Sequence, residues 1–425
     1  MADAFPPDEN RKAGAKKGSK SGKVADFRYK RPSHSKGTGK RERPGGSRKN
    51  SRSQGNGKGE TGRNRSAPAS RAKPHQSDQY YRKSEAYAAL DLGTNNCRLL
   101  IARPSGKDFT VIDAFSRVVK LGEDLATTGR LSDEAMDRAL GALSICAEKL
   151  RRRNVRLARS VATEACRRAS NGQEFIDRVR DQTGIALDII TAEEEARLAV
   201  LGCHILLEEG SGPAVIFDIG GGSTELVLLE KGGSSGGKIP RILDWQSVPW
   251  GVVSLTDTVE RTGGDATARL NRYTEMRRLV SESFAPFAER IAEASKAGDI
   301  RLLGTSGTVT TLASLHLELP HYDRKAVDGL IVPSEAMRAI SGDLSNMSSY
   351  ERSELPCIGQ DRANLVVAGC AILESILDLW PARRLGVADR GIREGILRSL
   401  MAAERQSERA LKALHENRSE QKPNE

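Results

Sequence analysis

Apolar runs alternate with polar, glycine-bearing segments in the chain from about residue 84 onward. The run Ala86–Leu90 leads into Asp91-Leu92-Gly93-Thr94-Asn95-Asn96, and a second apolar run, Cys97–Ala102, follows. Two short apolar runs around a turn that contains Gly and Asn are typical of a β-hairpin. We therefore predict a strand, a turn and a strand over residues 86–102.

The same pattern returns 127 positions later, counted from Asp91 to Asp218. The apolar run Ala214–Phe217 precedes the glycine-rich segment Asp218-Ile219-Gly220-Gly221-Gly222-Ser223-Thr224, and the run Glu225–Leu229 follows it. Two like hairpins in two like domains are expected to face each other across a cleft. Their backbone N–H groups would then bind a phosphate chain from both sides.

Further elements follow from the same reading of the chain. Helical periodicity extends from Ser132 to Leu150, and Ser132 is expected to cap this helix because Asp133 and Glu134 follow it in the first turn. Additional strands are predicted near Val161 and over residues 185–190.

A third glycine turn, Gly304-Thr305-Ser306-Gly307-Thr308, follows a predicted strand at Arg301–Leu303 and opens an apolar helix. The last globular segment, residues 389–395, leads into a helix at Ile396–Met401. From Ala402 onward the chain is charged, and we predict a frayed helix there.

The net charge of +11 is concentrated at one end of the chain. Residues 1–83 hold 23 Lys and Arg against 7 Asp and Glu, about +16, which leaves about −5 for the remainder. This segment has hardly an aliphatic residue, so it is expected to be disordered. It is either a solubilising tail or an arm that gathers a polyanion, whether RNA or a phosphate polymer.

Cysteine spacing and hydropathy indicate the compartment. None of the six cysteines forms a CxxC pair and most lie in apolar stretches, which favours buried free thiols over a disulfide frame or a zinc site. The first residues contain no apolar signal-peptide core, and no run approaches 18 apolar residues. We expect a soluble cytoplasmic protein that does not enter a membrane.

The second glycine turn is the more specific chemical signal. Three consecutive glycines are costly in a hairpin because glycine loses the most conformational entropy on folding. They are expected where a ligand approaches the backbone closely, although a flexible connector is the alternative. Asp218, just before them, is a candidate to hold Mg²⁺, which prefers few carboxylates together with phosphate oxygens.

The acidic segment that begins at Thr191 contains three glutamates. Thr191 and Glu194 have the spacing of a capping box, and Glu193 complements the helix dipole. Glu195 is not needed for either purpose. From the first turn of the helix it would project into the cleft as the general base for a water molecule, or else serve the structure only.

Three arginines are candidates to balance phosphate charge: Arg98, Arg167 and Arg393. Arginine matches phosphate oxygens bidentately, but surface ion pairs are the alternative for each. Arg167 is favoured because it follows Thr163, a candidate phosphate contact. The histidines show no metal-ligand spacing.

Taken together, these motifs resemble the Ppx/GppA family of exopolyphosphatases and guanosine pentaphosphate phosphohydrolases over about residues 86–400. The resemblance rests on Asp91-Leu92-Gly93-Thr94-Asn95, Ala162-Thr163 with Arg167, Glu194-Glu195-Ala196-Arg197-Leu198, Asp218-Ile219-Gly220-Gly221-Gly222-Ser223-Thr224-Glu225, Ser306-Gly307-Thr308 and Arg393-Glu394-Gly395. The combination in this order is highly specific.

The resemblance implies an α/β fold with two ribonuclease-H-like domains around a cleft, the actin-like ATPase / sugar kinase / Hsp70 architecture. We place these domains at residues 84–208 and 209–401, the second including returning C-terminal helices. A disordered basic arm at 1–83 precedes them and a charged tail at 402–425 follows.

The resemblance also implies Mg²⁺-dependent release of a terminal phosphate. Glu195 would be the general base, and Asp91 and Asp218 would be the acids of the cation site. The residues expected to bind substrate phosphates are Gly93, Thr94, Asn95, Arg98, Thr163, Arg167, Gly220, Gly221, Gly222, Ser223, Glu225, Ser306, Gly307 and Thr308.

Two departures from the family pattern bear on the substrate. Asn96 stands where many relatives have serine, and the helical C-terminal half of longer members does not follow Met401. The second departure favours short chains or a nucleotide, guanosine tetra- or pentaphosphate, whereas the basic arm favours a polymer. We expect inorganic polyphosphate, with guanosine pentaphosphate as the alternative, and a homodimer as in many relatives.

Two other classes of function remain open from the sequence. A phosphotransferase on the same scaffold would use the turn Gly304–Thr308 for adenosine, and it would require an acceptor for phosphate. A non-catalytic nucleotide- or RNA-binding protein would use the basic arm. The presence of Glu195 beside an intact Gly220–Ser223 segment favours the enzyme.

Overall fold

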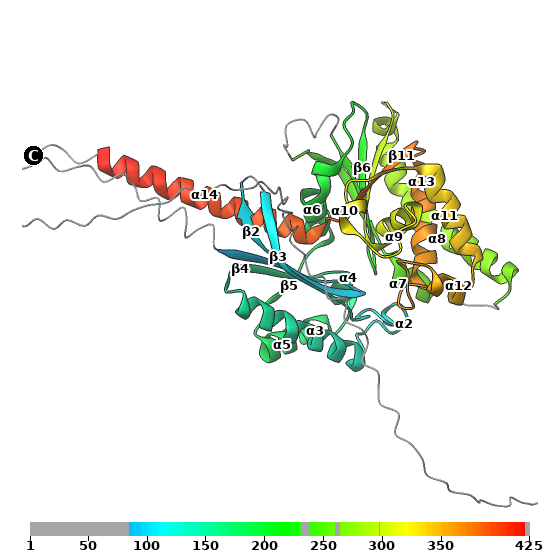
Figure 1. Cartoon of the computed structure of the whole chain (residues 1–425), viewed down its shortest axis with the longest axis horizontal. Helices are drawn as coiled ribbons and strands as arrows, with labels where there is room; N and C mark the ends of the chain where they lie inside the picture. The colour runs from blue at the N-terminus through cyan, green and yellow to red at the C-terminus, as the bar shows by residue number, and fades with distance from the viewer. Residues whose placement is uncertain (1–84, 107, 231–238, 260–263, 297, 421–425) are drawn as a thin grey trace, which may run out of the picture.

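The computed structural model describes residues 85–420 except 107, 231–238, 260–263 and 297, with side chains described as far as residue 410. The predicted basic arm at 1–83 lies outside the described residues. The described chain contains two mixed β-sheets, one of five strands and one of six, with helices packed on both (Figure 1).

The first sheet has the strand order β3-β2-β1-β4-β5. Its strands are β1 (Ala86–Leu92), β2 (Asn96–Ser105), β3 (Asp108–Val118), β4 (Val155–Ala162) and β5 (Leu187–Ile189). Strands β1, β2 and β3 are antiparallel neighbours, whereas β4 and β5 continue the sheet in parallel with β1. One face is covered by α3 (Asp133–Arg152) and α5 (Gly172–Thr183), whose apolar sides form one core with it.

The second sheet repeats this arrangement. Its order is β10-β11-β9-β6-β7-β8, so that β8-β7-β6-β9-β11 matches β3-β2-β1-β4-β5 in order and direction, with β10 added at the edge. The strands are β6 (Ala214–Ile219), β7 (Thr224–Leu229), β8 (Ile242–Val248), β9 (Arg301–Thr305), β10 (Ile331–Pro333) and β11 (Arg384–Ala388). This duplicated topology confirms the predicted fold class; the domain limits stay a prediction.

The largest core lies under the second sheet and includes the fully buried Phe217, Phe284 and Phe287. The long helices that build it are α8 (Ala266–Ser295), α9 (Gly307–His316), α11 (Ser334–Asn346) and α13 (Leu365–Leu379). The shorter helices are α2 (Leu125–Thr128), α4 (Glu164–Arg168), α7 (Val252–Thr258), α10 (Arg324–Val327), α12 (Ser349–Glu354) and the 3₁₀ turn η1 (His204–Leu206).

Two helices pack together across the free face of the first sheet: α6 (Ala192–Cys203) and α14 (Ile392–Glu420). Glycine makes this approach close, because a Cβ at Gly395 would lie 2.0 Å from the Leu198 carbonyl oxygen. A Cβ at Gly202 would lie equally close to the carbonyl oxygen of Gly391. The packing matters for function because α6 carries Glu195 in its first turn.

The predicted frayed helix after Ala402 is wrong in one respect: α14 continues as one helix to Glu420. Its first half is anchored, since Ile396, Leu397 and Met401 are buried against the first sheet. The Tyr87 hydroxyl also donates a hydrogen bond to Glu404. The helix then extends beyond the rest of the described chain (Figure 1).

Several local predictions are confirmed. Both hairpins form at the predicted positions, and the Ser132 hydroxyl caps α3 by accepting a hydrogen bond from the Ala135 N–H at 3.2 Å. The six cysteines are free thiols, and all but Cys357 are buried.

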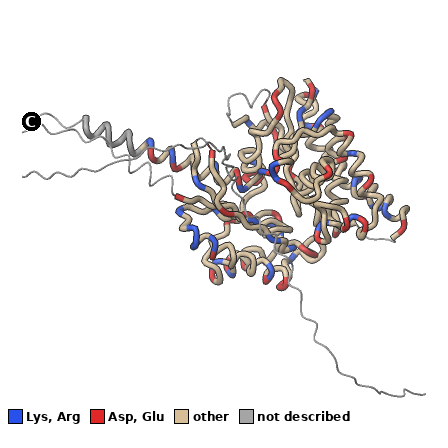
Figure 2. Tube along the Cα trace, viewed as in Figure 1, with Lys and Arg blue, Asp and Glu red and all other residues tan. Residues whose placement is uncertain are grey.

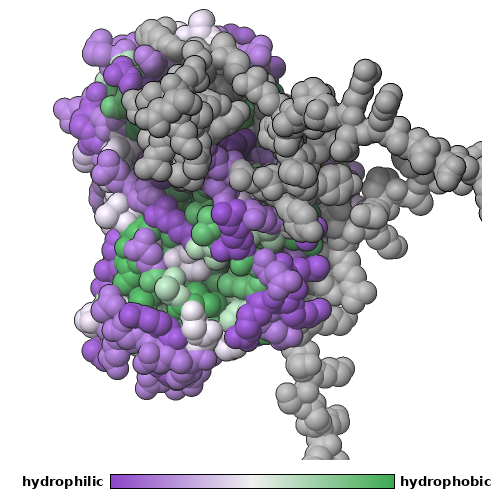
Figure 3. Space-filling model, turned by 90° about the vertical axis from the view of Figure 1, so that its left-hand side faces the viewer, coloured by the Kyte–Doolittle hydropathy of each residue, from purple (hydrophilic) through white to green (hydrophobic). Residues whose placement is uncertain are grey.

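Charged residues of both signs are mixed over the molecule. Lys and Arg are interspersed with Asp and Glu along both halves of the described chain (Figure 2). Hydrophobic residues gather at the height of the first sheet on one face, with hydrophilic residues around them (Figure 3). No helix in the described part is both long and apolar enough to cross a membrane.

Candidate active site

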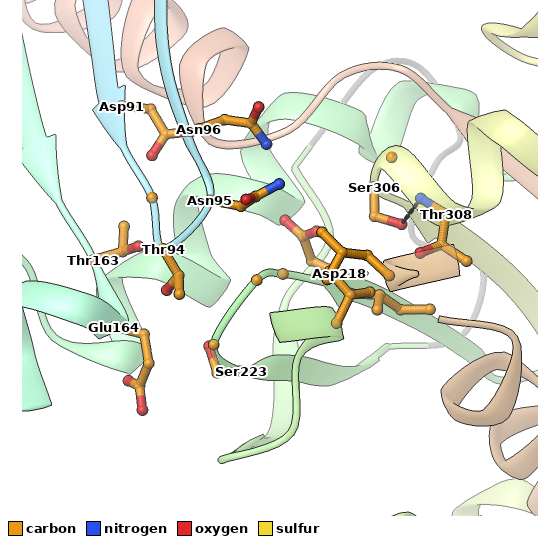
Figure 4. A pocket seen from close by; sticks show the side chains of 18 of the residues that line it. Asp91, Thr94, Asn95, Asn96, Thr163, Glu164, Asp218, Ser223, Ser306 and Thr308 are labelled. Atoms are coloured by element: carbon orange, nitrogen blue, oxygen red, sulfur yellow. Dashed lines mark hydrogen bonds between the residues drawn. The ribbon is translucent and has the colours of Figure 1, made fainter. Parts of the chain in front are cut away.

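A pocket of about 140 Å³ opens where the two sheets meet. It is lined by the turn of the β1–β2 hairpin, the turn of the β6–β7 hairpin, the start of α6 and the junction of β9 with α9. Figure 4 shows labelled side chains of both hairpins and of the junction of β9 with α9 around this pocket. The two like hairpins thus face one another, as the repeated pattern predicts.

The two turns are in contact with each other. A Cβ at Gly221 would lie 2.9 Å from the Thr94 Cβ, and a Cβ at Gly222 would lie 2.6 Å from the Thr94 hydroxyl oxygen. The prediction from the sequence is that these glycines allow a ligand to approach the backbone closely. In the structure, the atoms that crowd Gly221 and Gly222 belong to the first hairpin and to Glu164, so these glycines are required for the approach of the two halves.

Glu195 opens into the pocket from the first turn of α6, with only 6% of its surface exposed. The Thr191 hydroxyl caps this helix by accepting from the Glu194 N–H at 3.2 Å. The reciprocal half of the predicted capping box does not form, because the Glu194 carboxylate binds Arg159 and Arg197 instead.

Arg167, a predicted site residue, does not line the pocket. Its guanidinium donates to the Glu195 carboxylate at 3.1 Å, to the Ile190 carbonyl at 2.8 Å and to Glu164 at two nitrogens. Through these four hydrogen bonds Arg167 is a partner of the pocket acids. The predicted contact of Arg167 with a phosphate stays a prediction.

The electrostatic environment of Glu195 combines opposing influences. Burial raises its pKa well above the ordinary value, and the negative charges of Glu225 and Asp91 add to the rise. The positive charge of Arg167 and its hydrogen bond lower the pKa of Glu195 and offset part of this. A buried carboxyl with a raised pKa in a pocket is typical of a group that exchanges protons.

Three other acids lie at strand ends around the pocket. Burial, reinforced by the charges of Glu225 and Asp91, raises the pKa of Asp218 to about 8. Burial also raises the pKa of Asp91, which Arg98 partly offsets, and that of Glu225. The hydroxyls of Ser223 and Ser247 donate to the Glu225 carboxylate at 2.7 and 2.9 Å, which fixes its orientation.

The donor set fits a hard divalent cation. Asp91 and Asp218 approach the pocket from equivalent strands, and the buried side-chain amide oxygen of Asn95 (Oδ1) has no hydrogen-bond partner. The Asn95 side chain points from the first turn toward Asp218 (Figure 4). No group of three or more His, Cys, Asp and Glu side chains within the described ranges is close enough to hold a metal alone. Mg²⁺ needs only one or two carboxylates, because waters and substrate phosphates complete its coordination.

Two arginines line the pocket, Arg98 on β2 and Arg362 just before α13. Burial lowers the pKa of Arg362, and the positive charge of Arg98 lowers it further. Each guanidinium group destabilises the charged form of the other, and an anion placed between them would stabilise both. The third candidate, Arg393, is not among the pocket-lining residues; it interacts with Glu394, Asp389 and Asp91.

The third glycine turn forms the wall opposite the first hairpin. The Ser306 hydroxyl accepts from the N–H groups of Thr308 and Val309 at 3.2 and 3.3 Å and so caps α9 (Figure 4). Ser306 adopts a positive φ of 149°, a conformation rare for a residue with a side chain. Ser306, Gly307 and Thr308 all line the pocket, as predicted.

The predicted site residues therefore converge on one pocket, except that Arg167 and Arg393 do not line it. The pocket-lining residues that the sequence reading does not identify are Glu164, Ile219, Val252, Thr311, Arg362, Leu365, Val366 and Ile392. Asn96, which stands where relatives have serine, also lines the pocket. Glu164 follows Thr163, a predicted site residue, so its position next to that motif could have identified it. Arg362 precedes an ordinary apolar helix, and no spacing marks it.

Comparison with known proteins agrees with this geometry. The model of the Ppx/GppA phosphatase family matches residues 100–404. Exopolyphosphatase 2 of Mycobacterium tuberculosis is 31% identical over 327 residues, which cover 74% of this chain and 98% of that protein.

Solved structures give the same grouping. The Aquifex aeolicus Ppx/GppA family member is 29% identical with a TM-score of 0.60, over 75% of this chain and 98% of that one. An exopolyphosphatase from Cytophaga hutchinsonii is 25% identical with a TM-score of 0.65, also over 75% and 98%. The chain therefore belongs to the Ppx/GppA phosphatase family and is a phosphoanhydride hydrolase.

Proposed function

We propose that this enzyme releases the terminal phosphate of inorganic polyphosphate, with Glu195 as the general base and Mg²⁺ in the pocket. The observation that carries the proposal is the Glu195 carboxylate itself. It is buried, opens into a pocket that also contains the glycine-rich turn, and has a raised pKa. A general base is most effective when its pKa lies near the working pH.

The reaction is a hydrolysis in which a water oxygen attacks the terminal phosphorus. Glu195 accepts a proton from this water as the new P–O bond forms and the bridging P–O bond breaks. The bridging oxygen leaves as the end of the shortened chain, and orthophosphate is the other product. Arg167 donates to Glu195 at 3.1 Å and keeps its carboxylate oriented while the proton is transferred.

The cation would be held by the carboxylates of Asp91 and Asp218 and by the side-chain amide oxygen (Oδ1) of Asn95. Mg²⁺ held by these residues would supply positive charge that neutralises the phosphate oxygens. Two pocket features of the chain bind the remaining phosphate oxygens: the guanidinium groups of Arg98 and Arg362, and the backbone N–H groups of Gly221, Gly222 and Ser223.

Polyphosphate is preferred over the nucleotide because two of the three relatives named above are exopolyphosphatases. The surplus positive charge at residues 1–83 also favours a polyanionic polymer. The second candidate is guanosine pentaphosphate, since the family includes both activities. The third glycine turn, Ser306–Thr308, supports it by adding a wall to the pocket where a nucleoside would lie.

The test compares phosphate release from long-chain polyphosphate, tripolyphosphate and guanosine pentaphosphate, with Mg²⁺ and after chelation. Fastest release from the long chain is expected, with loss on chelation and recovery when Mg²⁺ returns. Fastest release from the nucleotide would instead assign the second candidate.

The base is tested by Glu195→Gln, which keeps the size of the side chain. Turnover is expected to fall by roughly 10²–10⁴-fold with substrate binding largely kept. Glu193→Gln is the matched control, because Glu193 is exposed in the same helical turn. Turnover that survives in Glu195→Gln would show that Glu195 serves the structure only.

A further inference from the structure

The carbonyl groups of the three glycines in the glycine-rich turn are held by one segment, the start of α7. The N–H of Val252 donates to the Gly220 carbonyl at 3.0 Å, and the N–H of Val253 donates to the Gly221 carbonyl at 2.8 Å. The Ser254 hydroxyl donates to the Gly222 carbonyl at 3.0 Å. Three consecutive carbonyl groups are therefore drawn toward α7.

Ser254 is at the centre of this arrangement and is buried. Its oxygen accepts from the Gly251 N–H at 2.9 Å. Its single proton has three acceptors in reach, the carbonyls of Gly222, Pro249 and Gly251 at 3.0, 3.1 and 3.4 Å, of which Gly222 is the nearest. The backbone lies so close that a Cβ at Gly251 would be 2.3 Å from the Gly221 carbonyl carbon. The hydroxyl thus ties the turn to the segment that precedes α7.

The orientation of these carbonyls determines the orientation of the neighbouring N–H groups. A peptide unit is planar and trans, so its N–H points opposite to its C=O. The carbonyls of Gly220, Gly221 and Gly222 are drawn toward α7. The N–H groups of the same three peptides, which belong to Gly221, Gly222 and Ser223, therefore point away from α7. Successive N–H groups on one side of a turn form an anion-binding nest.

The first half of the chain contains a counterpart without a hydroxyl. There the N–H groups of Val119 and Lys120 donate to the Asn95 carbonyl at 2.9 and 3.1 Å, and that of Gly122 donates to the Thr94 carbonyl at 2.9 Å. This segment follows β3 as α7 follows β8. In both halves, the chain after the third strand orients the turn between the first two.

We propose that Ser254 is a positioning residue for the hydrolysis proposed above: it fixes the Gly222–Ser223 peptide so that its N–H faces the substrate phosphate. Glycine at position 222 has no side chain to prevent the peptide from rotating. Without the Ser254 hydroxyl, this peptide can turn its carbonyl toward the pocket, where it repels phosphate oxygens.

The expected effect is on substrate binding. Ser254→Ala removes one neutral hydrogen bond, so KM should rise about 5- to 10-fold with a smaller change in kcat. Inhibition by inorganic phosphate should weaken by a similar factor. Ser254→Thr keeps the hydroxyl and should restore both values to within about twofold, which a general loss of packing would not explain.

The matched control is Ser375→Ala, because Ser375 is fully buried in α13 and its hydroxyl donates to the Ala371 carbonyl. All variants are compared by KM and kcat for the substrate that the native enzyme hydrolyses fastest, by inhibition with inorganic phosphate, and by Tm. If Ser254→Ala misfolds, Ser254→Cys keeps the side-chain volume with a weak donor and should give an intermediate KM.

The inference rests on the proposed function, but the two fail differently. A native enzyme that releases no phosphate from any of the three substrates would overturn the proposed function. A native enzyme that is active, with Ser254→Ala kinetics equal to those of Ser375→Ala, would overturn the role of Ser254 alone. That role would also be overturned if Ser254→Thr were as impaired as Ser254→Ala.

Discussion

Replacing Arg167 with Gln tests whether Glu195 is the group whose ionisation limits the reaction at low pH. A general base must be ionised, so kcat/KM falls as the pH drops through the pKa of that base in the free enzyme. Burial and the charges of Glu225 and Asp91 raise the pKa of Glu195, while Arg167 lowers it. Removing Arg167 therefore raises this pKa further, and the acidic limb of the profile moves to higher pH.

The size of the shift follows from the geometry. Unit charges 3.1 Å apart, as in the Arg167–Glu195 pair, interact by about 5 kcal/mol at an effective dielectric constant of about 20. At about 1.4 kcal/mol per pKa unit, this is a ceiling of nearly four units. Arg167 also serves Glu164, and water that replaces the guanidinium screens the acids. The expected displacement is about one to two pH units.

The assay is kcat/KM as a function of pH for the native enzyme, Arg167→Gln and Arg167→Lys. Arg167→Lys keeps the positive charge, so its limb should stay closer to that of the native enzyme. Arg178→Gln is the control, because Arg178 lies on α5 and pairs with Asp137 outside the pocket. Titration of substrate phosphates is common to all variants and cancels in the comparison. A limb that does not move, or that moves to lower pH, would refute the assignment of Glu195 as the base.

Three further outcomes are expected. Glu225→Gln removes a negative charge that raises the pKa of Glu195, so the acidic limb of the kcat/KM profile should move to lower pH, opposite to Arg167→Gln. A shift of this limb to higher pH would contradict the electrostatic account. Arg362→Gln should raise KM about 10- to 100-fold in steady-state kinetics, the range for one charge-assisted contact, and an unchanged KM would remove Arg362 from the substrate site. Gly221→Ala places a Cβ 2.9 Å from that of Thr94, so by denaturant unfolding it should lower stability by about 1–3 kcal/mol and also raise KM. Gly141→Ala, in open space on α3, should instead be neutral or stabilising, and equal effects of the two would disprove the contact between the turns.

The sequence predicts local features of this site well because they are encoded within short segments. Strand–turn–strand patterns place Asp91 and Asp218 at equivalent strand ends, and the cap at Thr191 places Glu195 in the first turn of α6. The duplication itself predicts that the two turns meet. These inferences need only the spacing of apolar residues along the chain and the known residue preferences of turns and helix caps.

The remainder of the site depends on contacts between distant segments. Arg167 lies close in sequence to Thr163, which suggests a phosphate contact, but its partner Glu195 is 28 positions away and only the fold brings them together. Arg362 reaches the pocket because α13 packs under the second sheet beside α8, a placement set by burial of an apolar helix. Neither relation has a period or spacing by which a single sequence could reveal it.

The polarity of the pocket follows from one divergence between the duplicated hairpins. Asp91 on β1 is paired across the strands with Arg98, whereas the equivalent Asp218 on β6 is paired with Glu225. The first hairpin thus presents an acid beside a base, which suits a phosphate. The second hairpin presents two acids. Burial, together with the negative charge of Glu225, raises the pKa of Asp218 to about 8, so two negative charges are unfavourable there. The proposed cation between the hairpins would relieve that repulsion. Burial raises the pKa of Glu195, and the charge of Glu225 raises it further, so the acid that stands opposite Asp218 on β7 also acts on the proposed base.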